Sequence, residues 1–205
     1  MTPEIHYHKY DLPLDVDLGN VIAVDTETMG LNPHRDPLCL VQLSGGDGVC
    51  HLVHLDRQTY DAPNLKAILS DTSSLKIFHF ARFDIATIAH HLNVLVAPVF
   101  CTKIASKLTR TYTSKHGLKD LCQSMLGIDI SKEQQMTDWG SAEFTPEQLK
   151  YAATDVLHLH ALKDRFVELL HRENRTDIAE ACFSFLPYRG VLDLLGYEDP
   201  DIFLH

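Results

Sequence analysis

Continuous apolar runs separated by turn-forming residues organise the first half of the chain. Three runs, at 21–24, 38–43 and 49–55, follow a loose N-terminal segment and are typical of short buried strands. The segment 44–48, Ser-Gly-Gly-Asp-Gly, is a strong turn signal between the second and third runs. This pattern predicts that these two strands form a hairpin.

The next part of the chain alternates predicted helices and strands. A short helix is expected at 64–69, a fourth strand at 75–80 and a helix at 83–92. A fifth strand is expected at 96–101, where Pro98 favours a strand end or an edge position. The fourth strand, its helix and the fifth strand together indicate a strand–helix–strand unit.

Helical periodicity prevails from about residue 102 onward. One helix start is clear, because Thr145, Pro146 and Gln148 fit the N-cap, N1 and N3 positions of a capping box. That helix is expected to continue to about Glu173. The later segment 181–189 is rich in large apolar side chains, which predicts either a subunit contact or packing on its own domain.

The order of these elements indicates an α/β fold. Hairpin strands come first, a strand–helix–strand unit follows, and helices come last. We expect a mixed β-sheet, antiparallel in its hairpin part and parallel in its βαβ part, flanked by helices and continued by a helical C-terminal part. No repeat or low-complexity linker is visible, so residues 1–205 are expected to form a single domain.

Composition narrows the class of protein. With 205 residues, of which 45% are hydrophobic, the chain is long enough to bury a sizeable core. The N-terminus lacks the basic and apolar regions of a signal peptide, and no apolar run reaches the length of a transmembrane helix. Five scattered cysteines without a C-x-x-C pair indicate reduced thiols and favour a cytoplasmic location.

The formal net charge of −10 argues against a protein that coats long nucleic acids, since such binding depends on neutralising phosphates. It leaves open a short nucleic-acid substrate that metal ions and a few local cations hold. Basic residues concentrate at 103–119, and no acidic residue lies between Cys101 and Lys119. This segment is either a solvated helix face or a substrate contact.

Asp25 and Glu27 lie at the end of the first predicted strand. Side chains two residues apart on a strand point to one face, so the two carboxylates are expected to stand side by side. Two close anions repel each other unless a proton or a cation such as Mg²⁺ relieves the repulsion. An isolated pair of this kind is usually solvated, so other residues must decide for or against a metal site.

Three later residues favour the metal site. Tyr151 and Asp155 are four residues apart in the capped helix and therefore share one face. The apolar neighbours of Asp155 predict partial burial, where an unpaired carboxylate is costly. Asp84 is expected in the first turn of the helix after the fourth strand, although the helix dipole alone would also explain an acidic residue there.

Together, Asp25, Glu27, Asp84 and Asp155 offer the carboxylates that two-metal phosphodiester hydrolysis requires. In this scheme Asp25 bridges two ions, while Glu27 and Asp155 hold the ion that activates water. Tyr151 is a poor general base, because a phenol has a pKa of about 10. We therefore expect Tyr151 to orient the attacking water by hydrogen bonding.

The arrangement resembles the DEDD superfamily of 3′-5′ exonucleases, in the branch whose third motif carries tyrosine. The motifs are Asp25-Thr26-Glu27, Phe83-Asp84 and Tyr151-x-x-x-Asp155, although His79 stands where ribonuclease D relatives commonly have Asn. The resemblance covers nearly the whole chain. It implies a ribonuclease H-like fold, the four carboxylates as metal ligands, the same four with Tyr151 as catalytic residues, and two Mg²⁺ or Mn²⁺ ions as cofactors.

Within this superfamily the chain is most similar to the nanoRNase C group, short ribonuclease D-like enzymes of some bacteria that degrade RNA dinucleotides. The points of likeness are the short length, the segment 33–36, and Asp138-Trp139 before the capped helix. Ending at His205, the chain is expected to lack the helical domains that bind RNA in larger ribonuclease D proteins. The resemblance also implies a homo-oligomer in a closed ring, such as an octamer.

Seven residues are candidates for contacting a substrate. The resemblance implies that Leu31, flanked by Met29, wedges between the two terminal bases, and the alternative for Leu31 is a core position at a turn. His79 and Arg82 flank the second motif and are candidates for phosphate or ribose contacts, while a structural role at a strand end is an equal alternative for His79. The candidates for gripping a 5′ phosphate are Arg110, Tyr112 and His116.

The chain is therefore predicted to be a metal-dependent 3′-5′ exoribonuclease. Its expected substrates are RNA dinucleotides or very short oligoribonucleotides, and its products nucleoside 5′-monophosphates. A ribonuclease D-type exonuclease acting on longer RNA or DNA is the alternative within this class. A nucleic-acid-binding module without catalysis is the alternative of another class, and it is disfavoured because all four carboxylates and Tyr151 are present.

Overall fold

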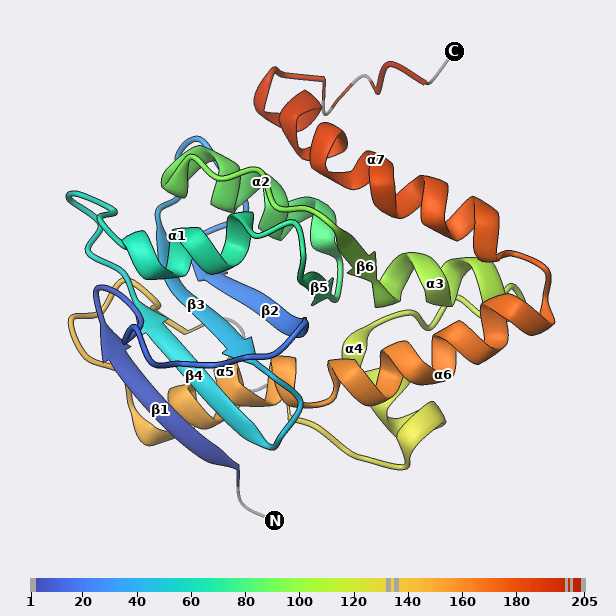
Figure 1. The fold of residues 1–205 in the computed structure, drawn as a ribbon, viewed down its shortest axis with the longest axis horizontal. Coiled ribbons are helices and arrows are strands. Elements are labelled where there is room, and N and C mark those ends of the chain that lie inside the picture. Colours follow the sequence, from blue (N-terminus) through green and yellow to red (C-terminus); the bar gives the residue numbers. More distant parts are fainter. Residues whose placement is uncertain (1–2, 132–133, 135–136, 198, 200, 204–205) are drawn as a thin grey trace.

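A computed structural model describes residues 3–131, 134, 137–197, 199 and 201–203. Its centre is a six-stranded sheet in the order β1-β4-β3-β2-β5-β6 (Figure 1). The strands are β1 (Glu4–Lys9), β2 (Val21–Thr28), β3 (Leu38–Ser44), β4 (Val49–His54), β5 (Leu75–Phe78) and β6 (Val99–Cys101). The described helices are α1 (Pro63–Ser70), α2 (Ala81–Leu92), α3 (Thr102–Thr109), α4 (Leu118–Leu121), the π-helical turn η1 (Cys122–Leu126), α5 (Pro146–Leu157), α6 (Leu159–Arg172) and α7 (Thr176–Leu194).

The sheet has an antiparallel and a parallel half, and both predictions are confirmed. β3 and β4 form the expected antiparallel hairpin, and β2 pairs antiparallel with β3. β2, β5 and β6 run parallel to one another, with α2 connecting β5 to β6. The registered pairing of β2 with β5 covers residues 21–23, so Asp25 and Glu27 lie beyond it, at the open end of β2.

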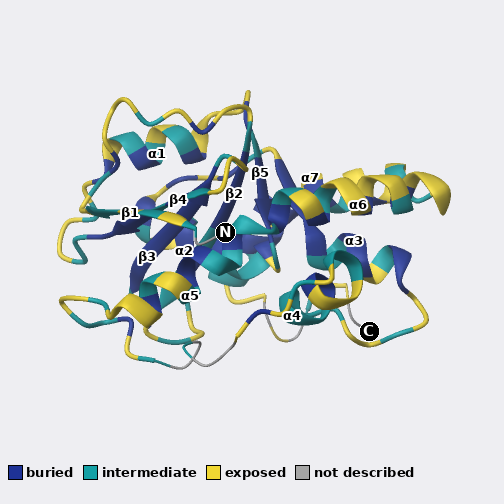
Figure 2. Ribbon diagram, turned by 90° about the horizontal axis from the view of Figure 1, so that it is seen from below, coloured by how far each residue is buried: buried dark blue, intermediate teal, exposed yellow. Residues whose placement is uncertain are grey.

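Helices cover both faces of the sheet, with α2 on one side and α5 on the other (Figure 1). Figure 2 shows the central strands buried between these layers, and all seven residues of β3 are buried. Burial on both faces explains why the central strands are continuous apolar runs in the sequence. Within the described ranges, no helix has the length and apolar character needed to cross a membrane.

The predicted start of α5 is confirmed, whereas its predicted length is wrong. Thr145 and Gln148 form the capping box, each side chain bonding the backbone of the other residue. The helix ends at Leu157, and α6 begins two residues later at Leu159. The break separates α5, which packs on β2, β3 and β4, from α6, which packs on α3. Local periodicity continues through this change of partner and therefore did not reveal it.

Two further elements differ from the prediction. The expected loose N-terminal segment contains β1, a parallel edge strand whose partly exposed Glu-Ile-His-Tyr-His-Lys sequence gives a weak strand signal. The apolar segment 181–189 is part of α7, although Pro187 lies inside the helix and is a poor helix former. Phe183 and Leu186 are buried against the same chain, which confirms intramolecular packing for much of this segment.

Candidate active site

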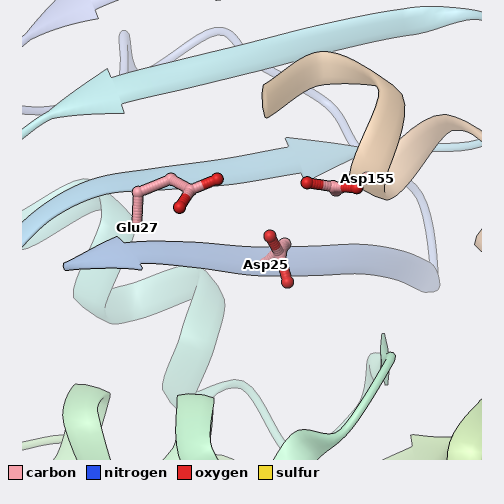
Figure 3. Close-up of side chains that lie close together, drawn as sticks. All are labelled: Asp25, Glu27 and Asp155. Atoms are coloured by element: carbon pink, nitrogen blue, oxygen red, sulfur yellow. The ribbon is translucent and has the colours of Figure 1, made fainter. Parts of the chain in front are cut away.

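Three carboxylates meet where α5 crosses β2. Asp25, Glu27 and Asp155 each place one carboxylate oxygen within 4.8 Å of those of the other two, as Figure 3 shows. The two residues of β2 share a face because side chains alternate along a strand. The capping box fixes where α5 starts, and the helical register then turns Asp155 toward this face. The predicted side-by-side placement of Asp25 and Glu27 is confirmed.

Asp84 approaches the same region from the first turn of α2, as predicted. Its side chain is buried, and Oδ1 accepts a hydrogen bond of 2.6 Å from the Thr26 hydroxyl. Thr26 points to the face opposite Asp25 and Glu27. Asp84 therefore lies outside the set of three mutually close oxygens, although its charge acts on both Asp25 and Glu27.

Burial and mutual repulsion govern the protonation of these groups. Burial is the largest cause that raises the pKa of Asp25 and of Glu27 well above its usual value, and the charges of the neighbouring carboxylates add to it. Burial also raises the pKa of Asp84 to about 7, against the lowering effect of its hydrogen bonds from Thr26. Full ionisation of the group at neutral pH is thus unfavourable without a cation, and carboxylate oxygens are the ligands that hard divalent cations prefer.

Two residues outside the predicted set of site residues position the carboxylates. Gln42 lies opposite Asp25 in the β2–β3 register, and its Nε2 donates long hydrogen bonds to Glu27 Oε1 (3.3 Å) and Asp25 Oδ2 (3.5 Å). Thr26 holds Asp84, as described above. The one signal in the sequence was the presence of a polar side chain inside each apolar strand. Burying such a group is costly unless it finds a hydrogen-bonding partner.

Tyr151 is partly buried beside the carboxylates. Its pKa is raised above the usual value, and burial is the largest cause. The charges of Asp155, Glu27 and Asp25 and a hydrogen bond with Asp155 raise it further. Its ring lies 6.2 Å, between centroids, from the ring of the buried Trp139. The hydroxyl therefore stays protonated at neutral pH. A protonated hydroxyl can donate a hydrogen bond but is unsuited to remove a proton, which agrees with the predicted orienting role.

The loop that follows β2 exposes apolar side chains near Glu27. Leu31 is 84% exposed, and Met29 is also exposed. The loop is held by a hydrogen bond from the Met29 amide to the Pro37 carbonyl and by one from the Asn32 amide to Asp36 Oδ2. The alternative that Leu31 is a core residue is wrong, so an apolar surface is available beside the carboxylates.

Four of the five remaining substrate candidates have structural partners. His79 Nδ1 lies 2.9 Å from Thr102 Oγ1, and Arg82 donates two hydrogen bonds of 2.7 Å to the carboxylate of Asp193 on α7. Of the 5′-phosphate candidates, Tyr112 is exposed. The other two are bound within their own part of the fold: Arg110 donates to the Lys115 carbonyl and to Ser124 Oγ, and His116 Nδ1 lies 2.8 Å from Ser106 Oγ. Substrate contacts by these five residues stay predictions.

Comparison with known proteins places this geometry in context. A family model described as 3′-5′ exonuclease matches residues 11–171, a range that contains all four carboxylates and Tyr151. Ribonuclease D of Gluconacetobacter diazotrophicus is 32% identical over 156 residues, which cover 76% of this chain and 39% of that protein. The chain thus spans less than half the length of the curated relatives it matches.

Solved structures give closer matches. Brucella melitensis NrnC bound to pGG is 51% identical, with a TM-score of 0.95 over 99% of both chains. NrnC with bound Mg²⁺ is 51% identical, with a TM-score of 0.94 over 98% of this chain and 99% of that one. Escherichia coli RNase D matches at 24% identity with a TM-score of 0.73, over 83% of this chain and 45% of that one, which shows a shared fold. The sheet, its order of elements and its flanking helices are those of the predicted ribonuclease H-like fold.

Proposed function

The chain belongs to the DEDD-type 3′-5′ exonuclease family, and from that membership we propose that it is an exoribonuclease acting on very short RNA. It removes nucleotides from the 3′ end of RNA dinucleotides and very short oligoribonucleotides and releases nucleoside 5′-monophosphates. The observation that carries the proposal is the set of three carboxylates within 4.8 Å of one another, next to Asp84 and Tyr151.

Divalent cations are the cofactors of the proposed reaction. Asp25, Glu27, Asp84 and Asp155 would hold two ions, Mg²⁺ or Mn²⁺. When bound, such ions supply an activated water at neutral pH and neutralise charge on the leaving oxygen. The chemistry of the chain supports this assignment, since burial and, after it, repulsion among the carboxylates raise the pKa of Asp25 and Glu27. The binding of Mg²⁺ to NrnC also supports it.

Residues of the chain position the reacting groups. A water oxygen attacks phosphorus, the bond from phosphorus to O3′ breaks, and the proton lost by the water is balanced by one gained at the O3′ of the preceding nucleotide, which leaves as a 3′ hydroxyl. Tyr151 keeps its proton and donates a hydrogen bond that orients the attacking oxygen. Gln42 holds Glu27 by a hydrogen bond from the neighbouring strand β3, and Thr26 holds Asp84 by a hydrogen bond on the opposite face of β2.

A short substrate fits the surroundings of the carboxylates. Leu31 and Met29 present an apolar surface against which terminal bases stack. His79 and Arg82 contact phosphate or ribose in this proposal, and the residues that grip a 5′ phosphate are Arg110, Tyr112 and His116. The net charge of −10 suits a ligand with few phosphates, and NrnC, which matches over its whole chain, binds pGG.

An exonuclease acting on longer RNA is the second candidate, which the 32% identity to a ribonuclease D supports. Time courses on 5′-phosphorylated RNA of two to seven nucleotides, with Mg²⁺ or Mn²⁺, distinguish the two. We expect the dinucleotide to be hydrolysed at least tenfold faster than the heptanucleotide, and Asp155→Asn to abolish hydrolysis at every length. Equal rates at all lengths would favour the ribonuclease D-type activity. A folded wild-type protein without hydrolysis would indicate a binding module.

The proposal includes a homo-oligomer, such as an octameric ring. Phe185 and Tyr188 on α7 keep part of their apolar surface exposed, although their neighbours are buried within the chain. Light scattering coupled to gel filtration measures the mass of the assembly directly. A monomer of 23.2 kDa at micromolar concentration would contradict this part of the proposal.

A further inference from the structure

Three histidine rings gather on the outer part of the sheet, away from the carboxylates. His6 and His8 share one face of β1, and His51 lies opposite His6 in the parallel β1–β4 register. Tyr7, between the first two, faces the other way, toward Phe144 at the start of α5. The histidines therefore lie on the face opposite α5, and β4 and β3 separate β1 from β2. The proposed hydrolysis has no role for them.

The three rings are close enough to share a ligand. Ring centroids are 5.3 Å apart for His8 and His51, 5.2 Å for His6 and His51, and 6.4 Å for His6 and His8. The same rings line a cavity of about 320 Å³ together with Asp15 and Asp17, from the segment between β1 and β2. The lining of the cavity thus combines histidine and aspartate residues.

One pair of nitrogens has nearly the spacing of metal ligands. His8 Nε2 and His51 Nδ1 are 3.0 Å apart. Two histidine nitrogens at about 2.0–2.1 Å from a tetrahedral Zn²⁺ ion lie roughly 3.3 Å from each other. A spread of about 0.3 Å therefore lets an ion take the place of the proton that the two nitrogens share.

We propose that His8 and His51, completed by His6, form a binding site for a zinc-type transition-metal ion. Among the described residues, the ligand atoms of Asp25, Glu27 and Asp155 lie within 4.8 Å of one another, whereas those of the three histidines do not, so His6 has to move to complete the site. His6 Nε2 now bonds Glu4 at 2.7 Å, and the side chain of His6 is 45% exposed, which leaves space for its ring to turn toward His8 and His51. Asp15 and Asp17 add negative charge there.

The histidine site is expected to prefer a different metal ion from the one that the carboxylates bind. Neutral imidazole suits Zn²⁺, Cu²⁺ or Ni²⁺, whereas Mg²⁺ prefers oxygen ligands. Burial and the neighbouring histidines lower the pKa of His8 and of His51, which favours the neutral form that binds metal. An ion held between β1 and β4 would tie the edge strand to the sheet and stabilise the folded chain.

Zinc binding to the untagged full chain tests this proposal. Titration calorimetry with ZnCl₂ in excess Mg²⁺, which occupies the carboxylates, should show one zinc per chain. Thermal unfolding should shift upward by several degrees with zinc. We expect the double variant His8→Gln/His51→Gln to lose at least tenfold in affinity together with the thermal shift, and His6→Gln to lose less. His171→Gln, which removes an exposed histidine at the end of α6, is the matched control and should behave as wild type.

Several outcomes would overturn the proposal. Absence of zinc binding by the wild type in excess Mg²⁺ contradicts it, and so does equal binding by a folded double variant. Unchanged affinity in His6→Gln contradicts the part given to His6. If the double variant fails to fold, Co²⁺ bound to the wild type serves as a second measurement. Its visible spectrum should be that of a nitrogen-ligated tetrahedral ion, and a purely oxygen-ligated octahedral spectrum would contradict histidine binding.

Discussion

The carboxylate site and the basic segment 103–119 differ in how their charged side chains are compensated. Asp25 and Glu27 lie next to further carboxylates, and burial, followed by the charges of these neighbours, raises their pKa. Arg110 is only 7% exposed, yet its guanidinium donates to the Lys115 carbonyl and to Ser124 Oγ. The buried Arg110 has hydrogen-bond acceptors in the following loop and in η1, whereas the carboxylates have unrelieved repulsion among them.

This difference favours the carboxylates over the basic segment as the region that carries chemistry. Both were visible in the sequence, one as an acidic pair and the other as a basic run. A buried charged group that has hydrogen-bonding partners is compatible with a stable fold, whereas uncompensated repulsion between like charges lowers the stability of the folded chain. Such repulsion is typical of a functional site, because a ligand has to relieve it.

Removal of one charge from the carboxylate site should affect activity most strongly. We expect Asp25→Asn to lower kcat on a dinucleotide by about a thousandfold or more. The same change should raise the Tm of the metal-free protein, because it removes repulsion between buried carboxylates. Asp164→Asn, at an exposed position on α6, is the control and should change neither quantity. Retained activity, or a lower Tm in Asp25→Asn, would contradict this interpretation of the site.

The metal-free protein should lose stability as the pH rises from about 4 to about 7. A carboxyl group with a raised pKa binds its proton more tightly in the folded chain, so its contribution is lost as the pH rises through that pKa. Burial raises the pKa of Asp84 to about 7, which corresponds to about 4 kcal/mol for this group. Urea unfolding between pH 4.5 and 8 in EDTA measures the slope. Saturating Mg²⁺, or Asp84→Asn, should flatten it, and a flat profile in EDTA for the wild type would contradict the prediction.

Tyr151→Phe should separate orientation of the water from metal binding. The substitution keeps the ring that packs near Trp139 and removes only the hydroxyl. We expect kcat to fall about a hundredfold, with KM and the Mg²⁺ dependence nearly unchanged. Asp155→Ala, by comparison, should lose both activity and metal binding. Full turnover in Tyr151→Phe alongside an inactive Asp155→Ala would show that the tyrosine does not orient the water.

Gln42→Leu should loosen the carboxylates without removing a charge. The substitution removes the long hydrogen bonds to Asp25 and Glu27 and keeps a similar side-chain volume. We expect about a tenfold loss in kcat and a weaker apparent affinity for Mg²⁺. Gln123→Leu, at an exposed position on η1, is the matched control. Wild-type kinetics in Gln42→Leu would show that Gln42 only fills space.

Substitutions in the basic segment should change both stability and substrate binding at Arg110, and substrate binding alone at Tyr112. Arg110→Gln removes buried hydrogen bonds and should lower the free energy of unfolding by about 1–3 kcal/mol. Tyr112→Ala, at an exposed position, should leave stability unchanged and raise KM a few fold for a 5′-phosphorylated dinucleotide. Kinetics on 5′-phosphate and 5′-hydroxyl substrates, together with urea unfolding, measure both effects. If Arg110→Gln changed only the preference for the 5′ phosphate, the contrast between the two charged regions would fail.

Much of the fold was present in the sequence because the relevant signals are local. The apolar runs of β2, β3 and β4 and the capping box of α5 each reflect the burial or hydrogen bonding of adjacent residues. β1 was not predicted, because the sequence of a partly exposed edge strand contains few apolar residues. The break before α6 was not predicted either, because helical periodicity is the same whichever neighbour a helix packs against.

By itself the sequence determined that Asp25 and Glu27 share a strand face and that Tyr151 and Asp155 share a helix face, because strand and helix periods are fixed by backbone geometry. Only the tertiary structure decided that α5 crosses β2, which brings Asp155 within 4.8 Å of the other two carboxylates. It likewise decided that Arg82 meets Asp193, which is 111 residues away along the chain. Distances between elements depend on how whole faces pack, and that is set by contacts far apart in the sequence.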